Sequence, residues 1–558
     1  MKATMIITII TVCLNRANTL AAAIKSVQSQ ITHEFEIEHL IIDGQSTDGT
    51  QEIALGFPHV TLISEPDEGL YDAMNKGIRL AKGQYILFLN SDDILANGSL
   101  KKVLPFMNAN YDVICCGADI RRLNKGTSDT ILDSITSEDA IVLSPETACL
   151  GTPLLNSKFF NHQYLIKNIG EFNTKFKIAA DADLLFRAAL KNPRLAVLPF
   201  ISYHYIEHAG SITINADGNN GMQAARECLN ISELHLERAN ISKKVIKVLR
   251  AWHADKEISL IRKKEPAGIK FNILFKINLI NFYFYFSYLV KRKLTPDWKR
   301  FIHRLNSLSQ SQQDIWLLEN IFKGKREGTF VEIGAYDGIS YSNCALMEGA
   351  FGWNGISIEP NPEMYKKLCQ SRVARSLNVA IGSGEGVLPF RLAGMLSGLI
   401  ENYDPEHADR VEREFGKDDE NSIINVPVKD IGTILQEEKI DHIDYISIDV
   451  EGAEDIILEN LVKIKIPIAA LTLENNYQKK ELTQKVKSMG LIKIFELEAD
   501  EVFIAQGTIS TWKIKYFQIK YKISIKRLFF KSIAPWLKKN LPHSVIDILK
   551  ETRNKIGR

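Results

Sequence analysis

Acidic side chains that directly follow apolar runs are the first residues of this sequence that could do chemistry. Asp43 follows the run 40–42, and Asp92 and Asp93 follow the run 85–89. If these runs are parallel strands, their carboxyl ends share one edge of a sheet, where ligands bind in open α/β folds. Carboxylates at that edge can hold a divalent cation, Mg²⁺ or Mn²⁺, and through it the diphosphate of a nucleotide.

A second group pairs glycines with acids in the C-terminal half of the chain. The motif Glu332-x-Gly334-x-x-x-Gly338 ends one apolar run, and Glu359 ends the next, 355–358. Glycines let the backbone approach a cofactor closely, and an acid on the next strand can accept hydrogen bonds from both ribose hydroxyls. The spacing differs from the dinucleotide-binding Gly-x-Gly-x-x-Gly, so we expect a smaller cofactor without a pyrophosphate.

Two series of alternating strands and helices would position these residues. In the first series, strands are predicted at 5–12, 37–43, 59–64, 84–90 and 112–119, and helices at 18–30, 48–55, 70–82 and 181–191. In the second series, strands are predicted at 329–333, 355–359, 376–381, 444–449 and 469–474. This alternation is typical of α/β domains with a parallel sheet covered on both faces.

The length and the charge pattern divide the chain further. A chain of 558 residues is too long for one core, so we assign 1–240 and 306–510 to two domains, with a linker at 241–305 and a tail at 511–558. The net charge of +2 conceals a strong segregation, because 241–300 and 511–558 each carry +11 and leave −20 on the remainder. Two basic segments therefore flank the second, otherwise acidic, domain.

Cysteine usage and the N-terminus both bear on the compartment. The seven cysteines form no Cys-x-x-Cys pair and no regular framework, which indicates a reducing environment. Lys2 and the apolar residues 3–14 could be taken for a signal peptide. The β-branched run 6–12, followed by a strand in βαβ order, favours a buried parallel strand instead. We therefore expect a cytoplasmic protein.

The aromatic segment 271–290 raises the question of a membrane. It is about long enough to span a bilayer, but Lys276 and Asn278 would be costly in hydrocarbon. Its aromatic residues and the basic flank 291–293 suit a helix that lies at a membrane interface beside anionic lipid. An interdomain helix that packs on both domains explains the same pattern, and both interpretations stay open.

The N-terminal motifs resemble those of family 2 glycosyltransferases with the GT-A fold, especially those that decorate bacterial surface polysaccharides. The resemblance covers roughly 4–215 and depends most on the block 65–77, which precedes the strand that ends in Asn90-Ser91-Asp92-Asp93. It implies a nucleotide-sugar donor. It also implies that Asp43 contacts the nucleoside and that Asp92 and Asp93 bind the metal and the diphosphate, although Asn90 stands where many members have another acid.

The same resemblance implies residues on the acceptor side. Asp181 matches the general base at the start of a helix, with Asp183 as the second candidate, although both acids could simply cap that helix. His208 matches a histidine near the metal. An aspartate base in this fold acts by single displacement and inverts the anomeric carbon. Gln-x-x-Arg-Trp, the usual motif of processive synthases, is absent from the sequence, so we expect the addition of one or a few sugars.

The C-terminal motifs, together with the run 444–454, resemble the FkbM-like methyltransferases over roughly 310–505. That family implies a Rossmann-like class I methyltransferase fold, S-adenosyl-L-methionine as the methyl donor, and a sugar hydroxyl as the acceptor. The residues expected to line this cofactor are Glu332, Gly334, Gly338 and Glu359. Asp449 and Glu451 would lie near the transferred methyl group and take or orient the proton of the acceptor, or would only cap the next helix.

A fusion of two such domains predicts one pathway, in which a glycan or lipid-linked oligosaccharide is both glycosylated and methylated. We expect this enzyme at the inner face of the cell membrane, held by its basic segments. Two alternatives remain: only one domain is active and the other is a binding module, or the methyltransferase acts on RNA. Nucleic acid is not the expected partner, because 271–290 and 512–530 are rich in apolar and aromatic residues.

Overall fold

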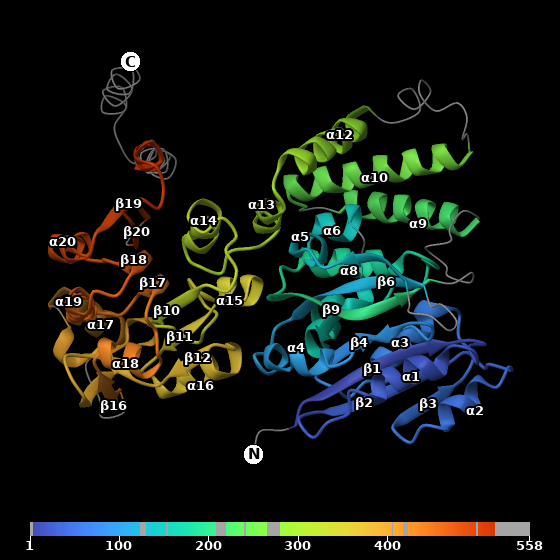
Figure 1. Ribbon diagram of the computed structural model, residues 1–558, viewed down its shortest axis with the longest axis horizontal. Coiled ribbons are helices and arrows are strands. Elements are labelled where there is room, and N and C mark those ends of the chain that lie inside the picture. Colours follow the sequence, from blue (N-terminus) through green and yellow to red (C-terminus); the bar gives the residue numbers. More distant parts are fainter. Residues whose placement is uncertain are drawn as a thin grey trace. The chain divides into compact units, whose positions relative to one another are not determined.

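The computed structural model describes residues 4–122, 130–151, 154–207, 219–238, 241–264, 279–403, 405–416, 422–497 and 500–518. It divides into two compact units (Figure 1). The first comprises Met1–Glu327, Gly338–Trp353 and Lys367–Ala374, and the second comprises Gly328–Asp337, Asn354–Lys366 and Arg375–Arg558. Each unit contains a sheet with a parallel half and helices beside it, so the expected α/β class is confirmed.

The first unit is built on a nine-stranded sheet with the order β3-β2-β1-β4-β8-β6-β9-β5, and β7 pairs with β6. Its strands are β1 (Ile6–Cys13), β2 (Glu36–Asp43), β3 (Val60–Ser64), β4 (Tyr85–Phe88), β5 (Ile94–Leu95), β6 (Val113–Arg122), β7 (Thr130–Ile135), β8 (Lys158–Asn161) and β9 (Leu195–Ile206). Strands β3, β2, β1 and β4 are parallel. The order reverses between β1 and β4, which makes the carboxyl ends of these strands the expected ligand-binding edge.

Strand β1 shows why its sequence folds as a strand and not as a leader helix. Ile7 and Ile9 pack in the hydrophobic cluster on one face of the sheet, and Ile10 and Val12 pack in the cluster on the other. A β-branched run buried on both faces is characteristic of a central parallel strand. The helices of this part are α1 (Leu20–Gln28), α2 (Thr50–Leu55), α3 (Leu70–Leu80), α4 (Ser99–Asn108), α5 (Glu138–Ile141), α6 (Pro145–Leu150), η1 (Leu155–Ser157), α7 (His162–Tyr164), η2 (Leu165–Ile169) and α8 (Ala180–Leu190).

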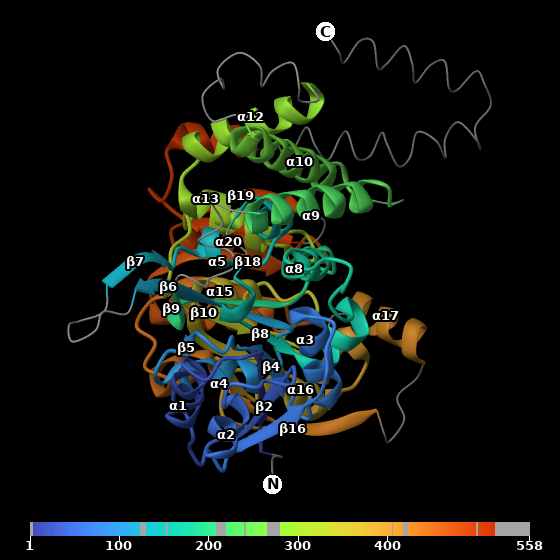
Figure 2. The same cartoon turned by 90° about the vertical axis from the view of Figure 1, so that its right-hand side faces the viewer.

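Further helices belong to the same unit. They are α9 (Asn219–Leu236), α10 (Lys243–Lys264), α12 (Leu279–Leu294), α13 (Asp297–Ile302), α14 (Gln313–Asn320) and α15 (Ala345–Phe351). Helix α10 packs between α9 and α12, and the three form a stack in both views (Figures 1 and 2). Trp252 of α10 and Ile231 of α9 are buried in the same cluster as Leu184 of α8. The segment predicted as a linker therefore contributes to the core of the first unit.

The aromatic segment belongs partly to these helices. Residues 279–290 belong to α12, whereas 271–278 lie outside the described residues. Across the described ranges, no helix combines the length and the apolar character that crossing a bilayer requires.

The second unit has a seven-stranded sheet with the order β12-β11-β10-β17-β18-β20-β19. Its strands are β10 (Thr329–Ile333), β11 (Asn354–Ile358), β12 (Arg375–Leu377), β17 (Ile443–Ile448), β18 (Ile468–Glu474), β19 (Leu491–Leu497) and β20 (Asp500–Ala505). The first five strands in the order are parallel, and β20 and β19 are antiparallel. The order reverses between β10 and β17, so the crevice at their carboxyl ends is the expected ligand site.

A smaller sheet, β13-β16-β14-β15, completes the second unit. Its strands are β13 (Ala380–Ile381), β14 (Gly386–Arg391), β15 (Gly398–Leu399) and β16 (Ile423–Lys429). The remaining helices are α16 (Pro362–Ser371), η3 (Gly394–Leu396), η4 (Ile400–Asn402), α17 (Pro405–Phe415), α18 (Ile431–Glu437), α19 (Glu454–Ile464) and α20 (Lys480–Ser488).

One predicted strand is wrong. The run 376–381 is not continuous, because β12 and β13 belong to different sheets. The Asn378 side chain between them donates hydrogen bonds of 2.9 Å to the carbonyl oxygens of Glu359 and Pro360. Asn378 thereby anchors the chain at the end of β11, where it leaves the main sheet.

Candidate active sites

Asp43 ends β2 and lies fully buried at the edge of the first sheet. Its carboxylate accepts hydrogen bonds from the Ser46 backbone amide at 3.0 Å and from the Ser64 hydroxyl at 2.7 Å. The Ser46 hydroxyl donates to the same carboxylate. Asp43 therefore fixes the turn after β2. A nucleoside could hydrogen-bond only to the lone pairs of its carboxylate that the two serines do not already occupy.

Asp92 and Asp93 follow β4, and the structure gives them different surroundings. Asp93 is buried, and its carboxylate accepts hydrogen bonds from the Ile206 amide at 2.7 Å, from the Asn90 side chain at 2.9 Å and from the Tyr203 hydroxyl. Burial, followed by the charge of Asp92, raises the pKa of Asp93 to about 7. Asp92 is only partly buried.

The chemistry of this pair fits a hard cation. Magnesium is usually bound through one or two carboxylates, with water and substrate phosphates completing its coordination. Within the described ranges, no group of three or more His, Cys, Asp and Glu side chains forms a metal cage. His208 lies outside the described residues. Asp92 is the more exposed of the two carboxylates, and Asp93 would have to exchange one of its donors to bind a metal.

Asp181 is the second residue of α8, near the positive end of that helix. Its carboxylate accepts a 2.8 Å hydrogen bond from the Ala182 amide. The Tyr71 hydroxyl lies 3.3 Å from the same carboxylate and 2.8 Å from the Ile178 carbonyl oxygen. Burial raises the pKa of Asp181 to about 6. A carboxylate with this pKa is ionised at neutral pH yet basic enough to accept a proton.

Asp183, the second candidate for the base, has a structural role. It is buried, and it lies 2.8 Å from Arg187 Nε and 2.8 Å from His235 Nε2. Both of its oxygens are therefore committed to α8 and α9. The structure favours Asp181 over Asp183 as the base.

Glu227 of α9 is a positioning residue that the sequence analysis missed. Its carboxylate accepts hydrogen bonds from the backbone amides of Lys177, Ile178 and Ala179 at 3.0, 2.8 and 2.9 Å. These amides immediately precede α8, so Glu227 fixes the entry to the helix that carries Asp181. A lone glutamate in an amphipathic helix gives no signal of this role.

In the second unit, Gly334 brings the ends of β10 and β17 together. It has a φ of 84°, and a Cβ atom there would lie 1.7 Å from the Asp449 carbonyl oxygen. The Asp449 amide also donates a 3.0 Å hydrogen bond to the carbonyl oxygen of Ile333. Only glycine allows this approach, so Gly334 places the Asp449 backbone directly beside the glycine turn.

Glu359 lies at the same edge, as predicted from its position after β11. Its carboxylate accepts 2.8 Å hydrogen bonds from the backbone amides of Tyr336 and Asn361. Burial raises the pKa of Glu359 to about 7. The acid and the glycine turn therefore meet, which a ribose-binding role requires.

The other two residues of the glycine motif serve the fold as well. Glu332 is buried within β10, and the Ser357 hydroxyl lies 3.5 Å from its carboxylate. A Cβ atom at Gly338 would lie 2.5 to 2.8 Å from side-chain atoms of Ser371, Leu368 and Arg372. Gly338 therefore admits the end of α16, and helix packing accounts for this glycine without a cofactor.

Asp449 belongs to a group of acids at the ends of β17, β18 and β20. It shares a hydrogen bond with Glu474, and the charges of Asp500 and Glu451 act on it as well. Asp449 is exposed at this edge as a whole residue, and its carboxyl group is partly desolvated by the protein around it. That desolvation, together with repulsion from Glu474, raises the pKa of Asp449 well above its ordinary value. Asp449 and Glu474 can therefore hold one proton between them.

Glu451 pairs with a histidine that the sequence analysis missed. His407 of α17 is buried, and its Nδ1 lies 3.1 Å from Glu451 Oε2 and 3.3 Å from the Tyr477 hydroxyl. Its Nε2 lies 3.2 Å from the Leu396 carbonyl oxygen, which can only accept. Nε2 therefore donates to Leu396, and Nδ1 faces both Glu451 and the Tyr477 hydroxyl.

Two family models match this chain, one in its N-terminal part and one in its C-terminal part. Residues 8–148 match the family model for glycosyl transferase family 2, and residues 332–490 match the methyltransferase FkbM domain. A PGL/p-HBAD biosynthesis glycosyltransferase of Mycobacterium tuberculosis is 28% identical over 190 residues, which are 33% of this chain and 68% of that protein.

One further relative and one solved structure are similar to part of this chain. A minor teichoic acid biosynthesis protein of Bacillus subtilis is 26% identical over 223 residues, which are 37% of this chain and 23% of that protein. The crystal structure of S. aureus TarS 1-349 is 17% identical, with a TM-score of 0.36, and the match covers 56% of this chain and 87% of TarS 1-349.

Proposed function

Because the chain joins a family 2 glycosyltransferase domain to an FkbM methyltransferase domain, we propose that it is a bifunctional enzyme of glycan assembly. The first domain transfers a sugar from a nucleotide-sugar to a glycan acceptor, and the second methylates a sugar hydroxyl with S-adenosylmethionine. The observation that carries the proposal is the pair of acid groups, each at the carboxyl edge of a parallel sheet whose strand order reverses there.

Donor binding in the first domain would depend on Asp92 and Asp43. Asp92 would hold a Mg²⁺ or Mn²⁺ ion, which neutralises the diphosphate as it leaves. Asp93 supports the loop through Tyr203 and Ile206, and a nearby cation would favour its ionised form. Asp43 would contact the nucleoside from the end of β2, and His208 would lie close to the diphosphate.

Asp181 would serve as the general base of sugar transfer. It would take the proton of the acceptor hydroxyl while that oxygen forms its bond to the anomeric carbon. The bond to the diphosphate breaks on the opposite face, so the anomeric configuration inverts. A pKa of about 6 matches this task near neutral pH, and the Glu227 contacts hold the start of α8 in place.

In the second domain, Gly334, Glu332 and Glu359 would surround S-adenosylmethionine, which supplies the methyl group, whereas helix packing accounts for Gly338. The acceptor oxygen forms a bond to the methyl carbon as the sulfur–carbon bond breaks. The hydroxyl proton would pass to a carboxylate of the Asp449–Glu474 pair or to Glu451. Glu451 is oriented by His407, and its position two residues after Asp449 keeps both acids at one strand end.

The acceptor class is inferred from the relatives, and the cellular location from the basic segments of the sequence. The mycobacterial relative is named for PGL/p-HBAD biosynthesis and the Bacillus relative for minor teichoic acid biosynthesis. We infer that the acceptor is a surface glycan or a lipid-linked precursor, and that the enzyme works at the inner face of the cell membrane as a peripheral protein. Vesicle flotation with the full-length protein tests the membrane part, since retention on anionic lipid should weaken with salt.

The test of both activities is product analysis by mass spectrometry. Full-length protein is incubated with a panel of nucleotide-sugars and a glycan acceptor, with and without S-adenosylmethionine. We expect one sugar mass to be added in both conditions, and a further methyl mass only with the methyl donor. A methyl added to RNA and not to glycan would refute the proposed acceptor class, and no sugar addition with any donor would refute the first activity.

A further inference from the structure

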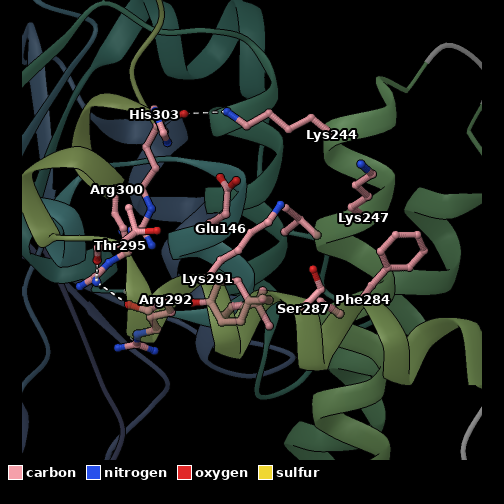
Figure 3. A pocket seen from close by; sticks show the side chains of 15 residues that line it. Glu146, Lys244, Lys247, Phe284, Ser287, Lys291, Arg292, Thr295, Arg300 and His303 are labelled. Atoms are coloured by element: carbon pink, nitrogen blue, oxygen red, sulfur yellow. Dashed lines mark hydrogen bonds between the residues drawn. The ribbon is translucent and has the colours of Figure 1, made fainter. Parts of the chain in front are cut away.

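A cavity of about 410 Å³ lies among helices α6, α10, α12 and α13 of the first unit (Figure 3). None of the acids described above lines it. The cations that line it are Lys244, Lys247, Lys291, Arg292, Arg300 and Arg304. Apolar walls come from residues such as Val248, Phe284 and Tyr288. In Figure 3 the Lys291 side chain extends toward Glu146, whereas Lys244 donates a 2.8 Å hydrogen bond to the His303 carbonyl oxygen.

The positive charge of this cavity is only partly compensated. Asp139 forms ion pairs with Arg300 at 3.0 Å and with Arg304 at 3.5 Å. Within the described ranges, no carboxylate forms an ion pair with Lys247 or Lys291. Several cations around one cavity repel each other unless an anion joins them. The cavity therefore suits an anionic ligand, and phosphate is the anion that Lys and Arg clusters bind most readily.

Glu146 adds a second requirement to the ligand. It is the one carboxylate among the lining residues, and one of its oxygens is buried without a hydrogen-bond partner in the described part of the chain. A buried acceptor of this kind is costly unless a donor reaches it. A ligand that combines a phosphate with a hydroxyl group would meet the cations and Glu146 together.

Exposed apolar side chains on α12 point to the source of that ligand. Tyr283, Phe286 and Leu294 are 66%, 58% and 77% exposed, whereas Phe284, Ser287 and Lys291 face the cavity. A helix with large apolar side chains outward and basic residues beside them is suited to the boundary between lipid headgroups and acyl chains. A phosphate free in solution would give no reason for this exposed apolar face.

We propose that this cavity binds the phosphate of an anionic membrane phospholipid whose headgroup carries a hydroxyl, as in phosphatidylglycerol. The apolar face of α12 enters the lipid interface beside it. The inference rests on the cavity and on α12, and it does not depend on the chemistry of either acid site. It names a specific lipid contact among the helices of the first unit.

Co-sedimentation of the full-length protein with vesicles tests this contact. Binding to vesicles of phosphatidylcholine with phosphatidylglycerol is compared with binding to phosphatidylcholine alone. The variant Lys247→Glu with Lys291→Glu should bind the anionic vesicles at least roughly tenfold more weakly. The matched control, Lys480→Glu with Lys487→Glu, makes the same charge change on exposed positions of α20. Equal loss in both variants, or no loss in the first, would overturn the proposal.

Two further readouts separate the cavity from other basic segments and other ligands. A photoactivatable phosphatidylglycerol analogue should crosslink to peptides within 284–295 in the wild type and lose those crosslinks in the cavity variant. Melting temperatures within about 2 °C of the control would show that the variant is folded. Crosslinks confined to other segments, equal affinity for soluble glycerol 3-phosphate without vesicles, or displacement of the lipid by RNA would each overturn the proposal.

The apolar face gives an independent arm of the same test. Phe286→Ser removes an exposed ring without changing charge and should weaken vesicle binding by a similar factor at low and at high salt. The loss in the lysine variant should instead shrink as salt rises, because salt screens the attraction that it removes. If Phe286→Ser binds anionic vesicles as the wild type does, the placement of α12 in the interface is wrong.

Discussion

In the first unit, Asp93 and Asp181 lie among hydrogen-bond donors, whereas in the second unit Asp449 lies among other acids. Tyr203, Ile206 and Asn90 donate to Asp93, and these contacts favour its charged form. Glu474, Asp500 and Glu451 surround Asp449 and favour its protonated form. The first arrangement suits a cation and a base that is ready to accept a proton. The second can take up a proton at a pH where an isolated carboxylate would stay ionised.

The largest effect should come from removing the acid assigned to the metal. We expect Asp92→Ala to lower sugar transfer by roughly a thousandfold, since the metal stabilises the leaving diphosphate by several kcal/mol. Methyl transfer should change less than about twofold, because the second unit has its own acids. Separate assays of the two activities check this, with Asp133→Ala on the exposed strand β7 as the control. Loss of both activities would show that the two active sites do not work independently.

The base assigned to the first unit should give a smaller loss and a distinct pH profile. We expect Asp181→Asn to lower sugar transfer by about 10² to 10⁴-fold. In the wild type, the rate should fall below pH 6, because a base with a pKa of about 6 is protonated there. The Tyr71 hydrogen bond lowers the pKa of Asp181, so Tyr71→Phe should move this fall to higher pH. A profile unchanged in Tyr71→Phe would contradict the assignment.

The acid pair in the second unit should respond in the opposite direction. Glu474→Gln removes the neighbouring charge that raises the pKa of Asp449. The acid limb of the methyl-transfer profile should then move to lower pH. Rates measured from pH 5 to 9 check this, with the exposed Glu481→Gln as the control. A shift to higher pH would show that Asp449 is not the titrating group.

The smallest effect should come from the ribose side of the second site. Glu359→Gln replaces one acceptor oxygen with a donor group that faces a backbone amide of Tyr336 or Asn361. We expect roughly tenfold weaker binding of S-adenosylmethionine, the loss of about one hydrogen bond to a charged group. Isothermal titration measures it, and Glu363→Gln on the exposed start of α16 is the control. Unchanged affinity would remove Glu359 from the site.

The sequence predicted the strands and their acids because both are encoded locally. The β-branched run of β1 and the acids at the ends of β2, β4 and β11 can be read without knowing any distant contact. The partners of these acids could not be predicted. Tyr203 lies 110 residues from Asp93 and reaches it only because β9 pairs with β5. His407 reaches Glu451 from α17, which no periodic signal links to β17.

The split of 376–381 into two strands has a similar cause. The apolar pattern of that run is continuous, but Asn378 hydrogen-bonds to the end of β11 and turns the chain away. Glu474 is an intermediate case. It ends a predicted strand in the same way as Asp449, so the sequence indicates its place at the sheet edge. Its hydrogen bond to Asp449 could not be predicted.

Trp252 has a practical consequence for anyone who wishes to separate the two enzymes. The charge pattern invites a cut near residue 240, but Val248, Leu249 and Trp252 of α10 complete the core that also holds α8. A shortened N-terminal fragment without α10 would expose a buried indole and loosen the helix that carries Asp181. Such a fragment would be inactive because it is unstable. Its lack of activity would therefore not show that the first enzyme needs the second.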